Sequence, residues 1–330
     1  MSYAAPFRGL ATRLGVGGVA RRYYHEPLAN LRAMLLEGGP FEQRRTERGR
    51  LDMIAAARTL APLQPPTSTD SLEVCFLSGL RYWYQTLFCI YSLQRCTDIR
   101  VDPTIYDDGS FTDEAVAAIV RVVPWTKFVL GDEIEAQLDA FLPVSRFPTL
   151  RARRLRYLHL RKLCDIHLCR QGWTIVLDSD MLFFQRPIVL LDWAKFPRRP
   201  CHLIDVGRAY GYTPELMREL ADYPEAEHVN VGLTGLCSEM IDWPKLEYWC
   251  RIMLEREGES YLQEQALIAL LLAGQDCLRL PVEDYQVLPS LAEGRNPTAV
   301  LHHYVSYSKR SYYQWGWRRV LDGDTIEGSA

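Results

Sequence analysis

The sequence of 330 residues contains no apolar run of the roughly 18–20 residues that a membrane-spanning helix requires. The apolar segment at residues 14–20 is short and rich in glycine, so we expect no secretion signal there. The nine cysteines form no C-x-x-C pair and lie mostly in apolar segments, a pattern typical of reduced thiols in the cytosol and not of a disulfide or zinc framework. The sequence also lacks an internal repeat. These absences predict a cytoplasmic protein.

An excess of positive charge is also missing, because 38 basic side chains are set against 41 acidic ones and the net charge is −3. We therefore expect no general binding to nucleic acid. The charge is uneven, however, since the first 50 residues contain nine arginines, no lysine and four glutamates. Such a segment could contact an anionic membrane at its inner face, although most such runs are ordinary solvated surface.

Proline and glycine divide the chain into a short extension and a large domain. Residues 27–36 and 51–60 have helical spacing, and Gly38-Gly39-Pro40 is expected to end the first of these helices. A proline-rich stretch then predicts a linker. We expect an Arg-rich, partly helical N-terminal extension over residues 1–70 and one α/β domain over residues 71–330, a length that suits a single large core.

Strand-like and helical segments alternate through this domain. Strands are predicted at residues 72–77, 102–106, 175–177, 201–206 and 228–233, helices at 82–94, 113–123, 213–223 and 261–272, and both a strand and a helix between 129 and 141. The alternation predicts an α/β fold with a mostly parallel central sheet flanked by helices. Residues 146–170 carry eight basic side chains against the one carboxylate of Asp165, and the leucines among them, Leu155 and Leu158 included, predict one amphipathic helix with a basic outer side.

Two aspartates follow the predicted strand at residues 175–177. Asp178 and Asp180 lie two residues apart, so their side chains point the same way at the carboxyl end of a buried strand. Two carboxylates there repel each other unless a cation lies between them, and oxygen ligands suit Mg²⁺ or Mn²⁺. The alternative is a solvated Asp-Ser-Asp turn, which the apolar residues on both sides make less favourable.

The segment Val-Leu-Asp-Ser-Asp-Met-Leu-Phe-Phe at residues 176–184 resembles the D-x-D signature of nucleotide-sugar glycosyltransferases with the GT-A fold. Three further segments resemble those of glycosyltransferase family eight and occur in the family's order: Asn230-Val231-Gly232, Glu264-Gln265, and the stretch from His303 to Lys309. The likeness covers roughly residues 72–317. It implies a GT-A, Rossmann-like core. Glu264 stands where the family more commonly has aspartate, and Ser306 replaces a glycine, which changes the backbone freedom expected there.

The resemblance also implies roles for individual residues. Asp178, Asp180 and His303 would hold the metal, with His302 as the alternative histidine, and Glu264 and Gln265 would lie beside the anomeric carbon as catalytic groups. The donor would be bound by residues from the strand ends, the basic helix and the later motifs: Ser78, Tyr82, Asp107, Asp108, Arg161, Lys162, Asn230, Gly232 and Lys309. Among these, Tyr82 could stack on a base, Asp107 and Asp108 resemble the acidic turn on the uridine side, and Lys309 would contact the diphosphate.

These residues predict a metal-dependent glycosyltransferase that uses Mn²⁺ (or Mg²⁺) and a nucleoside diphosphate sugar, UDP-linked in the family's manner, with an acceptor that could be a glycan, a lipid or a protein. Family-eight likeness implies retention of configuration, while inversion stays open because we identify no catalytic base. One alternative is a nucleotidyltransferase, but the glycine-rich basic loop of such enzymes is poorly matched by the segment at residues 78–81. Another is a non-catalytic nucleotide-sugar-binding protein of the same fold.

Overall fold

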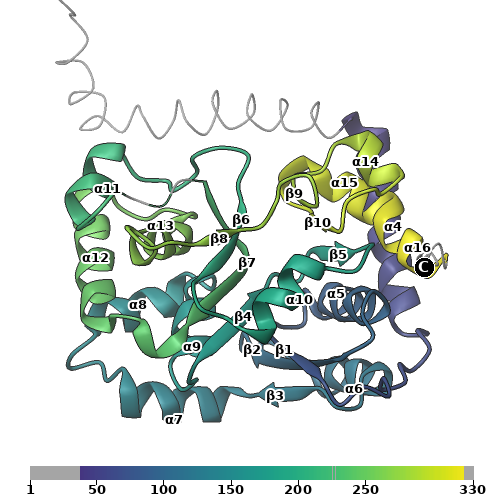
Figure 1. The fold of residues 1–330 in the computed structure, drawn as a ribbon, viewed down its shortest axis with the longest axis horizontal. Helices are drawn as coiled ribbons and strands as arrows, with labels where there is room; N and C mark the ends of the chain where they lie inside the picture. Colours follow the sequence, from purple (N-terminus) through teal and green to yellow (C-terminus); the bar gives the residue numbers. More distant parts are fainter. Residues whose placement is uncertain (1–37, 225, 227, 323–330) are drawn as a thin grey trace, which may run out of the picture.

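A seven-stranded mixed sheet runs through the middle of the protein, in a computed structural model that describes residues 38–224, 226 and 228–322 (Figure 1). Its strand order is β3-β2-β1-β4-β7-β6-β8, and only β7 is antiparallel to its neighbours. The strands are β1 (Ser71–Ser78), β2 (Arg100–Asp107), β3 (Lys127–Val129), β4 (Trp173–Leu177), β6 (Cys201–Ile204), β7 (Val229–Cys237) and β8 (Leu278–Arg279). The predicted α/β fold with a mostly parallel sheet is therefore confirmed.

A second, three-stranded sheet has the order β5-β10-β9. It consists of β5 (Met181–Phe183), β9 (Tyr285–Val287) and β10 (Leu301–His303). Strand β10 is antiparallel to β5, with His303 opposite Met181, and parallel to β9. Since β5 follows β4 after only three residues, this sheet brings the C-terminal part of the chain to the carboxyl end of β4.

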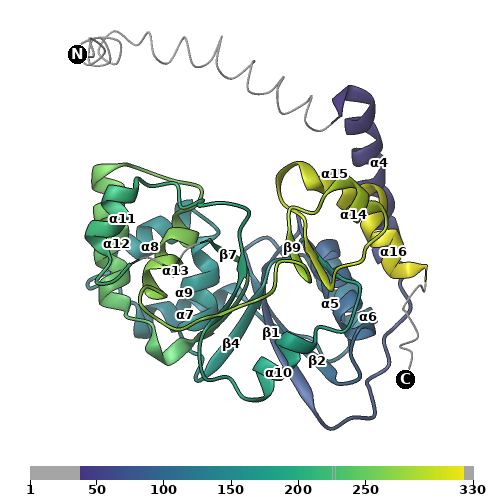
Figure 2. The ribbon, with the colours of Figure 1, turned by 45° about the horizontal axis from the view of Figure 1, so that its top comes forward.

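Helices cover both faces of the large sheet, as Figure 2 shows. In β1, Val74 and Phe76 pack into one apolar core with α5 (Trp83–Arg95) and α6 (Asp113–Val122), while Cys75 packs into a second core on the opposite face. This alternation is what a strand buried on both faces requires. The second core contains α7 (Gly131–Phe141), α8 (Pro148–Arg156), α9 (Leu160–His167), α11 (Pro214–Leu220), α12 (Trp243–Arg256) and α13 (Gln263–Leu271).

The remaining helices of the described residues lie outside the second core. They are α4 (Gly39–Ala57), α10 (Ile188–Lys195), α14 (Leu291–Arg295), α15 (Lys309–Ser311) and α16 (Trp317–Leu321), with short helical turns at Ser238–Met240 (η2) and Ser306–Ser308 (η3) and a π-helix at Tyr312–Gly316 (η4). No helix among the described residues is both long enough and apolar enough to cross a bilayer.

The prediction of a single basic helix over residues 146–170 is wrong. Two helices, α8 and α9, occupy this stretch and are separated at Tyr157, whose φ of −131° is extended. The expected faces are also reversed in α8, because Leu155 is 67% exposed whereas Arg154 is only 2% exposed, while Leu163 of α9 is buried as expected. The reason is charge pairing: Arg154 donates two hydrogen bonds, of 2.5 and 2.8 Å, to the buried carboxylate of Asp165. A bidentate arginine–carboxylate pair outweighs the preference of arginine for solvent.

The N-terminal extension differs from its prediction as well. Residues 27–36 lie outside the described residues, and the helix expected at 51–60 is α4, which begins at the Gly-Gly-Pro sequence that we expected only to end a helix. Gly38 has a left-handed φ of 91° and a proline occupies the first turn, an arrangement that starts helices well because proline needs no N–H partner there. The division of the chain at residue 70 stays a prediction.

Candidate active site and metal site

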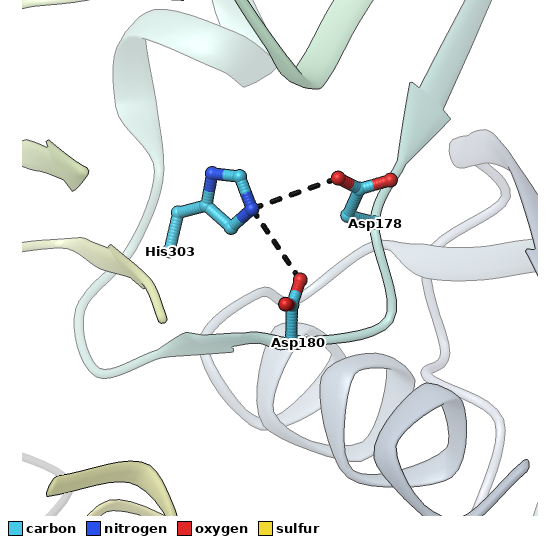
Figure 3. A group of neighbouring side chains, drawn as sticks. All are labelled: Asp178, Asp180 and His303. Carbon is cyan, nitrogen blue, oxygen red and sulfur yellow. Dashed lines mark ion pairs between the residues drawn. The ribbon is translucent and has the colours of Figure 1, made fainter. Parts of the chain in front are cut away.

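Asp178, Asp180 and His303 meet at the carboxyl end of β4 (Figure 3). The backbone N–H of Asp178 donates to the carbonyl oxygen of Gly232 on β7 (2.7 Å), which fixes the chain where it leaves the strand. The N–H of Tyr304 donates to the carbonyl oxygen of Asp180 (3.0 Å), and the pairing of β10 with β5 places His303 over the acids. Two segments that are more than 120 residues apart in sequence thus form one cluster.

The donor atoms of this cluster suit a divalent ion. One ligand atom from each of the three residues can be chosen so that all lie within 4.8 Å of one another. Nε2 of His303 lies 3.6 Å from Asp178 Oδ2 and 3.3 Å from Asp180 Oδ1, yet it is buried and makes no hydrogen bond. Two carboxylates and an imidazole are a set that Mn²⁺ accepts well, and Mg²⁺ less readily because of the nitrogen.

The electrostatics of the cluster favour charged acids. Burial alone would raise the pKa of Asp178 and Asp180, but positive charge nearby, led by Lys162 for Asp178 and by Lys309 for Asp180, holds both below the usual aspartate value. Burial alone would lower the pKa of His303, but the two aspartate carboxylates that face Nε2 favour the charged ring and raise the pKa to about 9. A metal ion would therefore compete with a proton at this imidazole.

Two lysines neutralise the acid pair. Lys162, on α9, lies 2.8 Å from Asp178 Oδ1 and 3.1 Å from Glu264 Oε1, and its side chain is 6% exposed. Lys309 pairs with Asp180 from the other side. Burial raises the pKa of Glu264 to about 8, against the opposing effect of Lys162. The structure therefore brings Glu264 and both predicted lysines to the acids.

The predicted residues Asn230, Gly232 and Gln265 lie on the β7 side of the cluster. Asn230 Oδ1 lies 2.9 Å from Nδ1 of His303. A Cβ built on Gly232 would lie 2.2 Å from a ring atom of His303, so the imidazole packs directly against this glycine. Gln265, 5% exposed at the start of α13, donates to Asp205 Oδ2 (3.0 Å) and to the carbonyl oxygen of Ala209 (2.6 Å).

Asp205 belongs to the same cluster, although the sequence pattern did not predict it. Its Oδ2 accepts hydrogen bonds from both Gln265 and Asn230, so one carboxylate orients the side-chain amides of two predicted residues. The only signal in the sequence was an acid at the end of the strand expected at residues 201–206, and a single carboxylate at a strand end is too common to single out.

The other predicted donor-binding residues gather around the ends of β1 and β2, where Ser78 pairs in register with Asp107. Asp107 Oδ1 accepts from three backbone N–H groups of the following turn, and Asp108 accepts from Ser110. Arg161 donates to the carbonyl oxygen of Asp108 (2.7 Å). These side chains build the turn, and Tyr82, 37% exposed, is the aromatic group beside it that stays open to solvent.

A chain of hydroxyl groups joins the end of β1 to the acid pair. Ser78 Oγ lies 2.6 Å from Thr86 Oγ1, which lies 2.8 Å from the hydroxyl of Ser179 between the two aspartates. Thr86 is another residue that the sequence analysis did not identify. It sits on α5, and no local pattern connects it to residue 179.

His302, the alternative ligand, faces away from the acids. Its Nε2 lies 2.9 Å from Glu293 Oε1 and its Nδ1 lies 2.9 Å from the hydroxyl of Tyr304. Adjacent residues of a strand point to opposite faces, so only one of the two histidines can reach the aspartates, and it is His303.

No family model matches the sequence, and no curated protein matches it. Solved structures do match by shape. The galactosyltransferase LgtC in complex with donor and acceptor sugar analogues superimposes with a TM-score of 0.54 at 15% identity, over 76% of this chain and 94% of that one. An active-site mutant of LgtC gives 0.52 at 14% identity over the same shares. The chain has the GT-A fold. This likeness confirms the fold expected from the motifs, and at such low identity it shows the fold alone.

Proposed function

We propose that this GT-A protein is a metal-dependent glycosyltransferase that moves a sugar from a nucleoside diphosphate sugar, UDP-linked, to an acceptor that is a glycan, a lipid or a protein. The observation that carries the proposal is the convergence of Asp178, Asp180 and His303 at the carboxyl end of β4. Ligands bind at this edge of open α/β sheets. The shared fold with a galactosyltransferase supports the same reaction class.

We assign Asp178, Asp180 and His303 as ligands of Mn²⁺ (or Mg²⁺). When bound, the ion would supply positive charge that offsets the negative charge of the departing diphosphate. Lys309, whose side chain is 32% exposed, could turn from Asp180 to a phosphate oxygen and add a second positive charge. The base and ribose would lie toward Ser78, Tyr82, Asp107 and Asp108, with Arg161 and Lys162 on the neighbouring helix.

Glu264 and Gln265 would lie against the sugar. The amide nitrogen of Gln265 is bound by Asp205 and Ala209, so its Oε1 is the atom free to face a sugar that develops positive charge as the glycosidic bond breaks. A carbonyl oxygen held there stabilises an oxocarbenium-like species from one face while the acceptor approaches the other. We propose retention on this basis, and inversion stays open because we assign no general base.

The experiment is release of UDP from a panel of UDP-sugars with Mn²⁺ present, compared with Asp180→Asn. This variant keeps the size of the side chain and removes its charge, so we expect loss of Mn²⁺-dependent UDP binding and of UDP release without unfolding. Release of pyrophosphate from a nucleoside triphosphate would favour a nucleotidyltransferase. Mn²⁺-dependent UDP binding without any turnover would favour a non-catalytic binding protein, and absence of both would sink the assignment.

We also propose that the protein acts in the cytoplasm and that its N-terminal extension contacts anionic membrane. On α4, Phe41 is 77% exposed, and Arg44, Arg45 and Arg48 are exposed on the same stretch. Exposed arginines beside an apolar group favour an anionic bilayer surface. Cosedimentation with anionic vesicles, and none with neutral ones, is the expected result.

A further inference from the structure

The side-chain amide of Asn230 is oriented from two sides. Its Oδ1 accepts from the backbone N–H of Gly232 (3.0 Å), and its Nδ2 donates to Asp205 Oδ2 (3.2 Å). A backbone N–H can only donate and an ionised carboxylate can only accept. Exchanging the oxygen and the nitrogen of the amide would therefore break both bonds, so the oxygen must face the histidine.

This orientation fixes the tautomer of His303. Nδ1 of the imidazole lies 2.9 Å from Asn230 Oδ1, which has no hydrogen to give. Nδ1 must therefore carry the proton, and in the neutral ring Nε2 is left with a free lone pair. This is the nitrogen that faces Asp178 and Asp180.

Packing holds the ring in the same orientation. His303 is 2% exposed and Asn230 is 5% exposed, so neither can exchange its partner for water. The backbone of Gly232 lies against the ring so closely that a Cβ there would be 2.2 Å from Cε1 and 2.4 Å from Nδ1. The edge of the ring that carries Nδ1 is therefore packed against the backbone of β7, where Asn230 Oδ1 meets it.

We propose that Asn230 is a positioning residue for the metal site, acting through His303. Its oxygen keeps the proton on Nδ1, so that Nε2 faces the ion that the two aspartates bind. This role rests on the proposed function, and it differs from direct contact between Asn230 and the donor sugar. Partners behind a ligating histidine typically change metal affinity by about 10–100-fold. We expect Asn230→Ala to weaken Mn²⁺ binding by about that factor.

The test measures Mn²⁺ affinity from the EPR signal of free Mn²⁺, on the full chain and without nucleotide. Pulsed EPR on protein labelled with ¹⁵N-histidine then reports whether an imidazole nitrogen coordinates the ion, a signal that His303→Gln should remove. Asn296→Ala is the matched control, because Asn296 accepts a hydrogen bond from Arg319 outside the cluster. A second variant combines Asn230→Asp with Asp205→Asn, which keeps an oxygen acceptor against Nδ1 and leaves Gln265 with its other bond, to the carbonyl oxygen of Ala209.

We expect Asn230→Ala to lose affinity and the ¹⁵N coupling, and the double variant to recover both, while Asn296→Ala behaves as wild type. The recovery separates positioning of the ring from a general loss of folding. Unchanged Mn²⁺ affinity and ¹⁵N coupling in Asn230→Ala would overturn the inference while leaving the proposed function intact. A wild-type protein that binds no Mn²⁺ would overturn both.

Discussion

Lys162 and Lys309 each pair with one of the two aspartates, but they are held differently. Lys162 is 6% exposed and has a second partner in Glu264, so it is a fixed counterion of the buried acids. Lys309 is 32% exposed, and Asp180 is the only carboxylate among the described residues with which it forms an ion pair. A bound ion would compete with Lys309 for Asp180, and the released ammonium would then be available to a phosphate.

This difference predicts opposite effects of one substitution. Lys309→Met removes the competitor of the metal, so Mn²⁺ affinity without nucleotide should rise, by about two- to fivefold for a partly exposed pair. Affinity for UDP in the presence of Mn²⁺ should fall by about tenfold, because a charged hydrogen bond to phosphate is lost. Titration calorimetry measures both. Lys195→Met, on an exposed lysine, should change neither, and a fall in Mn²⁺ affinity for Lys309→Met would contradict the exchange.

His303 leaves room only for glycine at position 232. In Gly232→Ala the new methyl group would overlap the imidazole, so the ring must move. We expect a loss of about 1–3 kcal/mol in the free energy of unfolding, measured with urea, and loss of Mn²⁺ binding. Gly131→Ala is the control, since a Cβ there meets nothing within 4 Å. Wild-type Mn²⁺ affinity in Gly232→Ala would show that the ring has room to adjust.

At the scale of elements, Glu293 holds the segment that leads into β10. Its carboxylate accepts hydrogen bonds from the N–H groups of Thr298 (2.6 Å) and Ala299 (2.9 Å) and from the hydroxyl of Thr298 (2.8 Å), and it pairs with His302. Burial alone would raise the pKa of Glu293, but these donors lower it to about 2. The ionised form of this acid is therefore part of the folded structure.

The pH dependence follows from the sign of that shift. A carboxyl with a lowered pKa stabilises the fold above its unfolded pKa of 4.5 and loses that contribution as the pH falls toward 2. The contribution of Glu293 is at most about 3 kcal/mol. Glu293→Gln should lower the stability at pH 6 and flatten the decline between pH 5 and 3, measured by urea unfolding. Glu283→Gln, on an exposed acid, is the control, and parallel pH curves for wild type and Glu293→Gln would contradict the argument.

The elements that the sequence predicted best are those whose pattern is local. Strand β4 and the acids after it were predictable because a short apolar run and two carboxylates two residues apart are read from neighbouring positions. Helices α8 and α9 were not, because the burial of Arg154 depends on Asp165 on the next helix. The same limit applies to Asn230, whose contact with His303 joins residues 73 positions apart. The family resemblance pointed to Asn230 and His303, but only the folded structure shows that they are in contact.

At the scale of the whole molecule, the first described helix packs on the last segment of the chain. Helix α4 lies beside α15 and α16 in both views (Figures 1 and 2), and it also contacts η4. Glu42 pairs with Arg310 (2.8 Å) and Asp52 with Arg318 (2.8 Å), so ion pairs join α4 to the segment that begins with Lys309. Met53 and Ala57 are fully buried in the core to which α5 also contributes. Helix α4 therefore supports the segment that contains Lys309, which is predicted to bind the sugar donor.

Gly49 is the point of closest approach in this packing. A Cβ at Gly49 would lie 2.2 Å from the carbonyl oxygen of Tyr313, a backbone atom that cannot rotate away. Gly49→Ala should therefore push α4 off the C-terminal segment, at a cost of about 1–3 kcal/mol. Hydrogen exchange should become faster over residues 309–321, and UDP affinity should fall with it, because Lys309 is no longer held in place. Ala55→Ser, on the exposed side of the same helix, should leave exchange unchanged. If Gly49→Ala leaves the exchange of residues 309–321 and the UDP affinity as in wild type, α4 is an independent appendage and the donor site does not depend on it.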